Sequence, residues 1–221
     1  MYTAIVLAAG MGSRMGLGYN KMLYTLAEEP VFVHTLRKFQ QDPHCGQLIL
    51  VINPQDRESI GDWLPEGALV VEGGAQRQDS VYAGLLAATE DIVLVHDGAR
   101  PFLSQSMIDG CVEWARQGGA AVVAVPVKDT IKRVGADGII EETLVRDELV
   151  SVQTPQAASY RTLKRAHLAA QAAGFLGTDE ASLIEKFTDV QVKVIEGSYT
   201  NIKLTTAEDL ILAKRLLKEG F

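Results

Sequence analysis

Short, continuous apolar runs recur along the chain and are separated by stretches in which apolar residues stand three or four positions apart. Runs of this kind are typical of strands that are buried on both faces of a parallel sheet. They lie at residues 3–7, 48–52, 68–71, 92–95 and 120–125. Because the runs alternate with helical stretches, they indicate βαβ units. The pattern therefore predicts an α/β fold with a mostly parallel sheet.

The stretches between the runs predict helices with one apolar face. Pro30 is expected to open the first helix, since its fixed φ suits a first turn, and Leu36 lies on the apolar face that follows. The last helix is expected at residues 207–218, with Thr206 as its N-cap and Asp209 as the second member of a capping box. Both helix starts are therefore predicted from local sequence signals.

Residues 127–152 break the alternation of strand and helix. Two β-rich pieces, at 130–134 and 139–145, flank a Gly-Ala-Asp-Gly sequence, which predicts a β-hairpin. A two-stranded hairpin is marginally stable alone and exposes its edges, so it needs a surface to lie against. That surface is either the rest of the same chain or a second copy that the hairpin embraces as an arm.

Size, composition and charge narrow the classes of protein that the chain can belong to. Its 221 residues, 47% of them hydrophobic, can bury one large core, and no linker or repeat divides them. We therefore expect one domain over residues 1–221. The formal net charge of −7 disfavours nonspecific nucleic-acid binding. No apolar run suits a membrane span and no secretory signal is evident, which favours a cytoplasmic protein with two reduced cysteines, Cys45 and Cys111.

A glycine-rich segment that carries positive charge follows the first strand. Gly10, Gly12 and Gly16 stand close together, Arg14 lies among them and Lys21 follows. Glycines let main-chain N–H groups approach a polyanion, and fixed cations stabilise charge that develops on phosphate oxygens. Open α/β sheets also bind ligands at the carboxyl ends of their strands. We infer a nucleotide site here, with a dinucleotide site or a structural turn as the alternatives.

Two common phosphate-binding motifs do not match this segment. The chain contains no Gly-Lys-Ser/Thr sequence after four intervening residues, which excludes a Walker loop. The three glycines are spaced one residue too widely for the dinucleotide fingerprint, and the second strand ends at Asn53 without the carboxylate that binds ribose. A nicotinamide oxidoreductase is therefore a weaker alternative.

Two further segments place polar groups after predicted strands. Gly73 and Gly74 permit close approach of a base or phosphate, and the Ser80 hydroxyl could read a base edge. A plain turn, with Ser80 or Asp79 as a helix cap, remains the alternative.

Asp97 follows the strand run at 92–95 and is expected at the same sheet edge, where a carboxylate suits Mg²⁺ bound mainly through substrate phosphates. Arg100 could bind a second phosphate or form a salt bridge with Asp97. His96 is expected to be structural, because no metal-ligand spacing accompanies it. Lys203 supplies one more cation before the last helix and could also be a solvated surface charge.

Together these segments resemble the 2-C-methyl-D-erythritol 4-phosphate cytidylyltransferase family over essentially the whole chain. The resemblance rests on Ala8-Ala9-Gly10-x-Gly12-x-Arg14-Met15-Gly16 with Lys21, Gly73-Gly74 with Ser80, His96-Asp97 with Arg100-Pro101, Asp129-Thr130-Ile131-Lys132, Gln153-Thr154-Pro155-Gln156, Thr178-Asp179-Glu180-Ala181-Ser182 and Asn201-Ile202-Lys203. It implies a Rossmann-like, three-layer nucleotidyltransferase fold with a protruding β-hairpin arm. It also implies a homodimer, in which the arm embraces the other subunit.

The resemblance assigns a role to each of these segments. It implies that CTP is held by Ala8, Ala9, Gly10, Gly12, Gly74 and Ser80. It places the catalytic cations Arg14, Lys21 and Lys203 around the α-phosphate. It assigns the methylerythritol phosphate to Asp97, Arg100, Thr178 and Lys203, with Thr130 and Arg146 contributed by the arm of the other subunit.

The implied reaction transfers a cytidylyl group from CTP to 2-C-methyl-D-erythritol 4-phosphate in non-mevalonate isoprenoid biosynthesis, with Mg²⁺ as the divalent cation. The alternatives are a ribitol 5-phosphate cytidylyltransferase and a noncatalytic nucleotide-binding regulator. The chain departs from the family's usual pattern in two places. Asn20 replaces the proline before the lysine and lacks its fixed φ, and Gly98 stands in the motif that is usually Asp-Ala-Ala-Arg.

Overall fold

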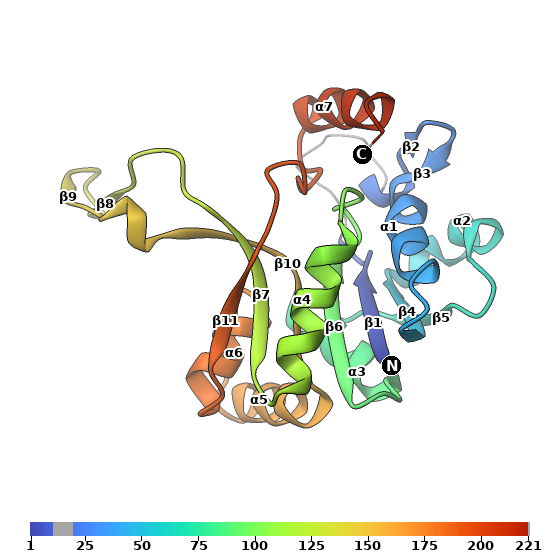
Figure 1. The fold of residues 1–221 in the computed structure, drawn as a ribbon, viewed down its shortest axis with the longest axis horizontal. Helices are drawn as coiled ribbons and strands as arrows, with labels where there is room; N and C mark the ends of the chain where they lie inside the picture. The colour runs from blue at the N-terminus through green and yellow to red at the C-terminus, as the bar shows by residue number, and fades with distance from the viewer. Residues whose placement is uncertain (11–19, 221) are drawn as a thin grey trace.

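The structure is a computed structural model that describes residues 1–10 and 20–220. Its centre is a seven-stranded sheet with strand order β11-β7-β10-β6-β1-β4-β5 (Figure 1). The strands are β1 (Tyr2–Leu7), β4 (Cys45–Ile52), β5 (Leu69–Glu72), β6 (Ile92–Asp97), β7 (Ala120–Pro126), β10 (Val150–Ser159) and β11 (Val192–Glu196). All neighbouring pairs in this sheet are parallel except those of β10, which runs antiparallel to both β6 and β7.

Helices cover both faces of the sheet and make three layers. On one face lie α1 (Val31–Gln40) and α4 (Gln105–Arg116), and on the other lie α3 (Arg77–Ala87), α5 (Tyr160–Ala172) and α6 (Glu180–Phe187). In β1, Ala4 and Val6 pack into the first layer and Ile5 into the second, because successive side chains in a strand point to opposite faces. This two-sided burial accounts for the continuous apolar runs of the sequence.

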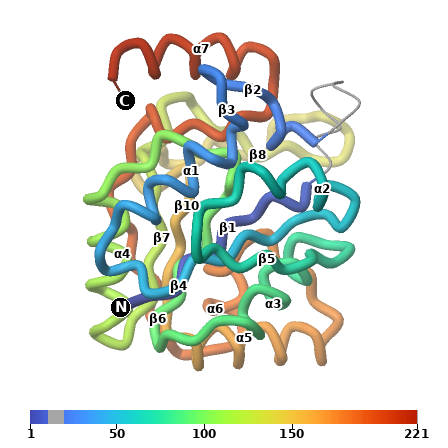
Figure 2. Tube along the Cα trace, turned by 90° about the vertical axis from the view of Figure 1, so that its right-hand side faces the viewer, coloured from blue at the N-terminus to red at the C-terminus, as the bar shows by residue number. Residues whose placement is uncertain are grey.

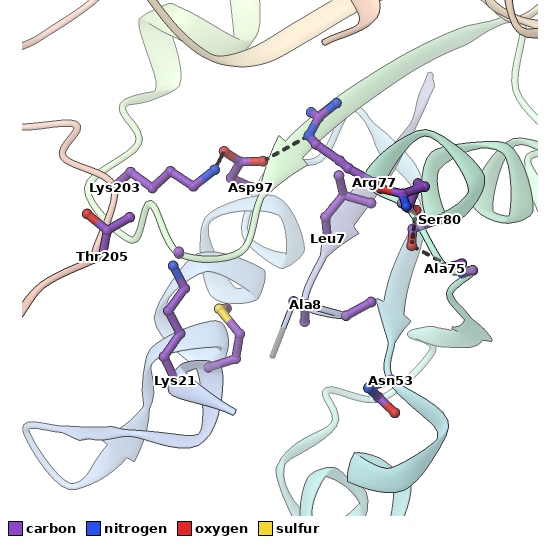
Figure 3. A pocket seen from close by; sticks show the side chains of 16 residues that line it. Leu7, Ala8, Lys21, Asn53, Ala75, Arg77, Ser80, Asp97, Lys203 and Thr205 are labelled. Atoms are coloured by element: carbon purple, nitrogen blue, oxygen red, sulfur yellow. Dashed lines mark hydrogen bonds and ion pairs between the residues drawn. The ribbon is translucent and has the colours of Figure 1, made fainter. Parts of the chain in front are cut away.

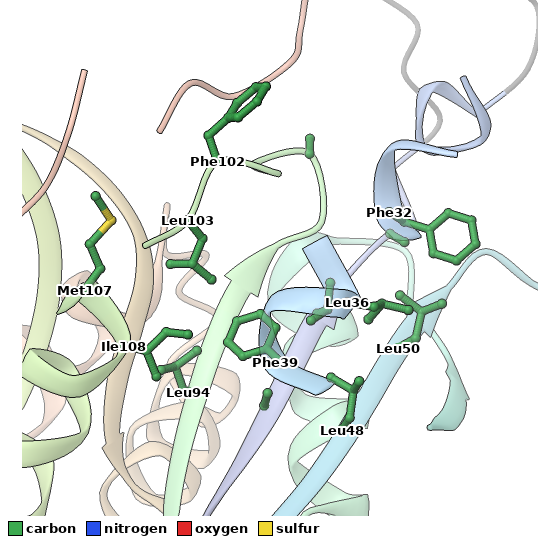
Figure 4. Close-up of a cluster of buried hydrophobic side chains, with 14 of the residues drawn as sticks. Phe32, Leu36, Phe39, Leu48, Leu50, Leu94, Phe102, Leu103, Met107 and Ile108 are labelled. Carbon is green, nitrogen blue, oxygen red and sulfur yellow. The ribbon is translucent and has the colours of Figure 1, made fainter. Parts of the chain in front are cut away.

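The first helix shows how the core forms from the sequence pattern. α1 begins directly after Pro30, and Phe32, Leu36 and Phe39 are fully buried against the sheet (Figure 4). A buried side chain of this size contributes roughly 1.5–3 kcal/mol through the hydrophobic effect. The helix is thereby fixed beside β1 and β4, the strands whose carboxyl ends lead toward the candidate site.

The C-terminal helix follows its sequence signals closely. α7 (Ala207–Lys218) has Thr206 as its N-cap, and Thr206 and Asp209 form the predicted capping box. Figure 2 shows α7 beside the small sheet formed by β2 (Thr25–Leu26) and β3 (Glu29–Pro30). α7 directly follows the segment that contains Lys203.

The hairpin projects away from the sheet as an arm (Figure 1). Its strands are β8 (Lys132–Val134) and β9 (Ile140–Thr143), and the turn between them places Gly138 at a φ of +81°. Both strands are exposed along their whole length. The last residues of the predicted 127–152 segment already belong to the main sheet, because Val150 pairs with Pro126.

The predicted α/β fold with a mostly parallel sheet and a protruding hairpin is confirmed. Among the strands of the main sheet and the helices that cover its faces, the sequence interpretation did not predict β10, β11 or α6. β10 contains polar residues and Pro155, and β11 is a short edge strand with a lysine, so neither forms a continuous apolar run. Within the described residues, no helix has both the length and the apolar composition to cross a bilayer.

Candidate active site

A cavity of about 610 Å³ lies at the carboxyl ends of the parallel strands (Figure 3). Leu7 and Ala8 line it at the end of β1, Asn53 after β4, and Asp97 at the end of β6. Its remaining described lining residues are Ala9, Gly10, Lys21, Met22, Gly74, Ala75, Gln76, Arg77, Ser80, Ala99, Lys203 and Thr205. The ends of β1, β4 and β6 bring Leu7, Asn53 and Asp97 to one edge of the sheet, which is where open α/β sheets bind ligands.

The start of the glycine-rich segment forms one wall of the cavity. Ala8 is buried, and its main-chain nitrogen donates to Val51 O at 2.7 Å, which holds the segment against β4. Ala9 and Gly10, for which nucleotide binding is predicted, also line the cavity. Gly12 and Arg14 lie outside the described residues.

The turn after β5 forms the adjacent wall. The Ser80 hydroxyl accepts from Gly74 N at 3.2 Å and donates to Gln76 O at 3.1 Å, so it stabilises the turn through two hydrogen bonds. The N-cap of α3 is Gln76, and Asp79 accepts from Gln76 N at 3.1 Å as the N3 residue of a capping box, so neither Ser80 nor Asp79 is itself the N-cap. Gly74 and Ser80 nevertheless line the cavity, so this turn is both a structural turn and part of the wall.

Two lysines reach the cavity from distant parts of the chain. Lys21 comes from the short 3₁₀ helix η2 (Lys21–Leu23), and Lys203 comes from the segment before α7. Leu204 N donates to Ala99 O at 2.9 Å, which fixes the Lys203 segment to the loop after β6. In Figure 3 both lysines lie on one side of the cavity, opposite Ser80 and Ala75.

Asp97 is surrounded by positive charge. Lys203 Nζ lies 2.8 Å from its Oδ2 atom, Arg77 Nε lies 3.7 Å from Oδ1, and Arg100 Nε lies 3.8 Å from Oδ2. Burial alone would raise the pKa of Asp97, but Lys203, Arg77 and Arg100 outweigh it and lower this pKa to about 2. The carboxylate is therefore ionised at neutral pH and orients the cations around it.

Arg77 is a site residue that the sequence interpretation did not single out. Its two terminal nitrogens donate to the two carboxylate oxygens of Glu180 at 2.8 and 2.9 Å, and Glu180 is buried. Such a bidentate pair fixes the guanidinium plane. The signal in the sequence was weak, because Arg77 and Glu180 are 103 positions apart. Asn53 and Thr205, which also line the cavity, were likewise not assigned a role there.

Four predicted substrate-binding residues lie outside this lining. Arg100 is largely buried and donates to Asn201 O at 2.7 Å, in addition to its ion pair with Asp97. Thr178 is exposed in the loop before α6. Thr130 and Arg146 are exposed on the arm, and Arg146 donates to Lys128 O at 3.3 Å. One copy of the chain thus brings together only part of the predicted acceptor site.

His96 is a structural residue, as expected. It is fully buried, and its ring nitrogens lie 3.0 Å from Thr154 Oγ1 and 3.1 Å from Arg100 O. Burial lowers the pKa of His96 to about 4, so the ring is neutral at physiological pH. It connects β6 to β10 and to the loop that carries Arg100.

The described part of the chain contains no cluster of three or more His, Cys, Asp or Glu residues that could hold a metal ion. Asp97 is the one carboxylate among the described lining residues, and its Oδ2 atom already accepts from Lys203. Magnesium commonly has few protein ligands and binds largely through substrate phosphates. The residues therefore fit a magnesium ion that a polyphosphate substrate carries, and its protein ligand would be Asp97 Oδ1, which faces Arg77 Nε at 3.7 Å and is not the oxygen bound by Lys203.

Comparison with known proteins supports the resemblance seen in the sequence. The 2-C-methyl-D-erythritol 4-phosphate cytidylyltransferase of Bacillus velezensis is 50% identical over 98% of this chain and 96% of its own length. The protein of the same name from Halalkalibacterium halodurans is 46% identical and covers 99% of this chain and 97% of its own length.

Solved structures agree with these relatives. The 4-diphosphocytidyl-2C-methyl-D-erythritol synthase of Anaerococcus prevotii superimposes with a TM-score of 0.88 at 32% identity, covering 99% of this chain and 98% of its own. The 2-C-methyl-D-erythritol 4-phosphate cytidylyltransferase of Thermus thermophilus gives a TM-score of 0.81 at 32% identity, covering 99% and 100%. A family model described as IspD, 2-C-methyl-D-erythritol 4-phosphate cytidylyltransferase, matches residues 2–219. Because this match spans nearly the whole chain, the protein belongs to the 2-C-methyl-D-erythritol 4-phosphate cytidylyltransferase family.

Proposed function

We propose that the protein transfers the cytidylyl group of CTP to 2-C-methyl-D-erythritol 4-phosphate and releases pyrophosphate, in non-mevalonate isoprenoid biosynthesis. The product is 4-diphosphocytidyl-2-C-methyl-D-erythritol. Family membership over nearly the whole chain supports this function. The structural observation that carries it is the placement of Lys21 and Lys203 in one cavity with the walls formed by Ala8 to Gly10 and Gly74.

The two sides of the cavity suggest how CTP lies in it. Ser80 and Gly74 offer a hydroxyl and a flat main-chain surface for the base, while Lys21 and Lys203 on the other side suit the triphosphate (Figure 3). Gly73 allows the two walls to meet at the base of the cavity, because a Cβ atom there would lie only 2.7 Å from Ala9 Cβ and would push the walls apart. The nucleoside is proposed to lie against Ala9 and Gly74, which both line the cavity.

In the proposed reaction, an oxygen of the acceptor phosphate attacks the α-phosphorus of CTP in line with the leaving group. The new O–P bond forms as the bond to the β-phosphate oxygen breaks, and pyrophosphate leaves with that electron pair. The attacking phosphate is already ionised, so no general base is required. Lys21 and Lys203, with Arg14 as a third proposed cation, align the reactants and stabilise the growing charge.

Asp97 serves this reaction by holding Lys203. Because its pKa is lowered to about 2, the carboxylate keeps its charge at working pH and accepts from Lys203 Nζ at 2.8 Å. Mg²⁺ is proposed as the divalent cation, carried mainly by the triphosphate, with Asp97 as its protein ligand. When bound, the ion neutralises phosphate charge as a Lewis acid.

The arm is proposed to complete the acceptor site in a homodimer. Val134, Ile139, Ile140 and Val145 on the arm are each more than half exposed, so the arm presents apolar surface that a second copy would bury. Thr130 and Arg146 lie on this arm and would reach the acceptor in the other subunit. Arg100 and Thr178 are proposed to face the same acceptor from the chain's own loops.

A pyrophosphate-release assay with CTP and Mg²⁺ tests the function. We expect release with 2-C-methyl-D-erythritol 4-phosphate and little with ribitol 5-phosphate. Release with ribitol 5-phosphate alone would instead establish the sister activity, and CTP binding without release under either condition would establish a noncatalytic regulator. The proposed compartment is the cytoplasm, in keeping with the two free thiols, Cys45 and Cys111.

A further inference from the structure

Asn20 is a nearly buried polar residue directly before Lys21. Its side chain is the N-cap of η2, where Oδ1 accepts from Met22 N at 3.0 Å. Its Nδ2 atom donates to Ala8 O at 2.8 Å and to Asp56 Oδ2 at 2.6 Å. All the hydrogen-bonding groups of this amide are therefore used, which is the expected state of a polar side chain that is only 6% exposed.

These three hydrogen bonds connect segments that form or adjoin the cavity. Ala8 directly follows β1 and forms part of a wall of the cavity. Asp56 lies in the 3₁₀ helix η3 (Pro54–Asp56), which begins directly after the lining residue Asn53. The Asn20 amide joins both of them to η2, which carries Lys21. The wall that contains Ala8 and the segment that carries Lys21 are thus linked through the Asn20 side chain.

The backbone of Asn20 gives a second, independent observation. Its φ of −62° is the value at which a proline ring would fix the residue. Asparagine has no such covalent restraint, so its conformation is held by the amide hydrogen bonds instead. An error of about 1 Å in the position of a catalytic group can cost on the order of a hundredfold in rate, so this restraint bears directly on Lys21.

We propose that Asn20 is a positioning residue for the reaction: its amide fixes the backbone of Lys21 relative to Ala8 and Asp56, and so places the lysine ammonium at the reacting phosphate. This inference rests on the proposed cytidylyl transfer. The wild-type assay tests that transfer, whereas the role of Asn20 is tested by ratios of variant to wild-type rate, so the two can fail separately.

The sharpest variant is Asn20→Asp, which keeps the size of the side chain and the acceptor for Met22 N. It removes both donated hydrogen bonds and places a carboxylate against Asp56. We expect kcat to fall by about tenfold to a hundredfold, with a smaller change in the KM for CTP. Adding Asp56→Asn should restore much of the rate, because the new amide at position 56 can donate to the new carboxylate at position 20.

Two comparisons separate positioning from a general structural role. In a Lys21→Ala background, Asn20→Asp should cause little further loss, because the positioned group is already absent. Asn20→Pro should retain more activity than Asn20→Asp, because proline supplies the observed φ. If Asn20→Asp does not fold, Asn20→Ala takes its place in the same cycle with Lys21→Ala.

Gln47→Glu provides a matched control. The Gln47 amide donates to the backbone carbonyl of Ala87 at 2.8 Å, as Asn20 donates to Ala8 O, but it lies outside the cavity lining. We expect this change to lower the thermal midpoint without lowering kcat. An unchanged kcat in Asn20→Asp, a loss that is equally large with and without Lys21, or an Asn20→Pro variant as slow as Asn20→Asp would each overturn the proposal.

Discussion

The ammonium nitrogen of Lys203 lies 2.8 Å from Oδ2 of Asp97 at the edge of the cavity. The opposite oxygen of the same carboxylate faces Arg77 Nε at 3.7 Å (Figure 3). One ionised side chain at the end of β6 therefore orients a cation from the C-terminal segment and another from the start of α3. Arg77 and Lys203, which are more than 100 positions apart in the sequence, thus both pair with the Asp97 carboxylate.

Asp97→Asn should lower both turnover and stability, because a neutral amide holds Lys203 and Arg77 less strongly. The loss in the free energy of unfolding should stay below the roughly 3–5 kcal/mol typical of breaking a buried pair, because the Lys203 side chain is 37% exposed. The pKa of Asp97 is lowered from 3.8 to about 2. Its contribution is therefore complete above about pH 4 and is lost as the pH falls toward 2.

Urea unfolding of wild type and Asp97→Asn at several pH values tests whether the stabilisation by Asp97 is lost as the pH falls. The difference in unfolding free energy should be constant above about pH 4 and should shrink below it. A difference that stays unchanged down to pH 2 would contradict the lowered pKa.

Lys21→Ala should fold normally and lose about 10² to 10³ in turnover, because one charged donor to the developing phosphate charge is removed. Circular dichroism and a pyrophosphate-release assay measure the two effects. Lys218→Ala, at an exposed lysine that ends α7, serves as the control and should match wild type. Near-normal turnover in Lys21→Ala would refute the catalytic role.

Glu180→Gln and Arg77→Lys should each reduce kcat/KM, because each breaks the bidentate pair that fixes the Arg77 guanidinium beside Asp97. A double-mutant cycle should give a coupling energy of roughly 0.5–3 kcal/mol. The exposed Arg215–Glu219 pair, at 2.9 Å, is the control, and its coupling should fall within about 0–1 kcal/mol without affecting activity. Additive effects at Arg77 and Glu180 would show that the pair does not act as a unit.

Gly73→Ala should raise the KM for CTP, because the added Cβ would lie 2.7 Å from Ala9 Cβ and 2.8 Å from Ser80 Oγ. These contacts force the two proposed nucleoside walls to shift. Gly61→Ala is the matched control, since a Cβ there meets no atom within 4 Å. Steady-state kinetics with varied CTP distinguishes the two variants, and equal KM values would argue against a nucleoside between these walls.

Replacing Ile139 and Ile140 with glutamate should convert the proposed dimer to a monomer and abolish most activity. These side chains are 65% and 57% exposed in the single chain, so the change should not disturb its own fold. Light scattering after size-exclusion chromatography measures the oligomeric state. Ile211→Glu, at a side chain that is 72% exposed on α7, should leave both mass and activity unchanged. A wild-type monomer with full activity would exclude the arm from the acceptor site.

Elements that are defined by neighbouring residues could be predicted from the sequence alone. The buried parallel strands appear as continuous apolar runs because both of their faces are covered, and β1 and β6 are the clearest cases. α7 was predicted at its observed bounds, since its capping box lies within four residues of sequence. The hairpin followed from its turn chemistry. β10 was not recognised, because it contains polar residues and Pro155 and therefore lacks the local pattern of a strand. Its pairing with β6 and β7, which are distant in sequence, makes it one.

By itself, the sequence determined that the chain forms an α/β sheet with helices on both faces, and that glycines and cations follow its strands. It also supplied the motifs that identify the family. Only the tertiary structure decided that Arg77 binds Glu180, that one carboxylate holds Lys203, and that Asn20 joins Ala8 to Asp56. Apolar periodicity is a local property of the chain, whereas a pair of charges or hydrogen-bonding groups far apart in sequence meets only when the sheet brings their strands to one edge.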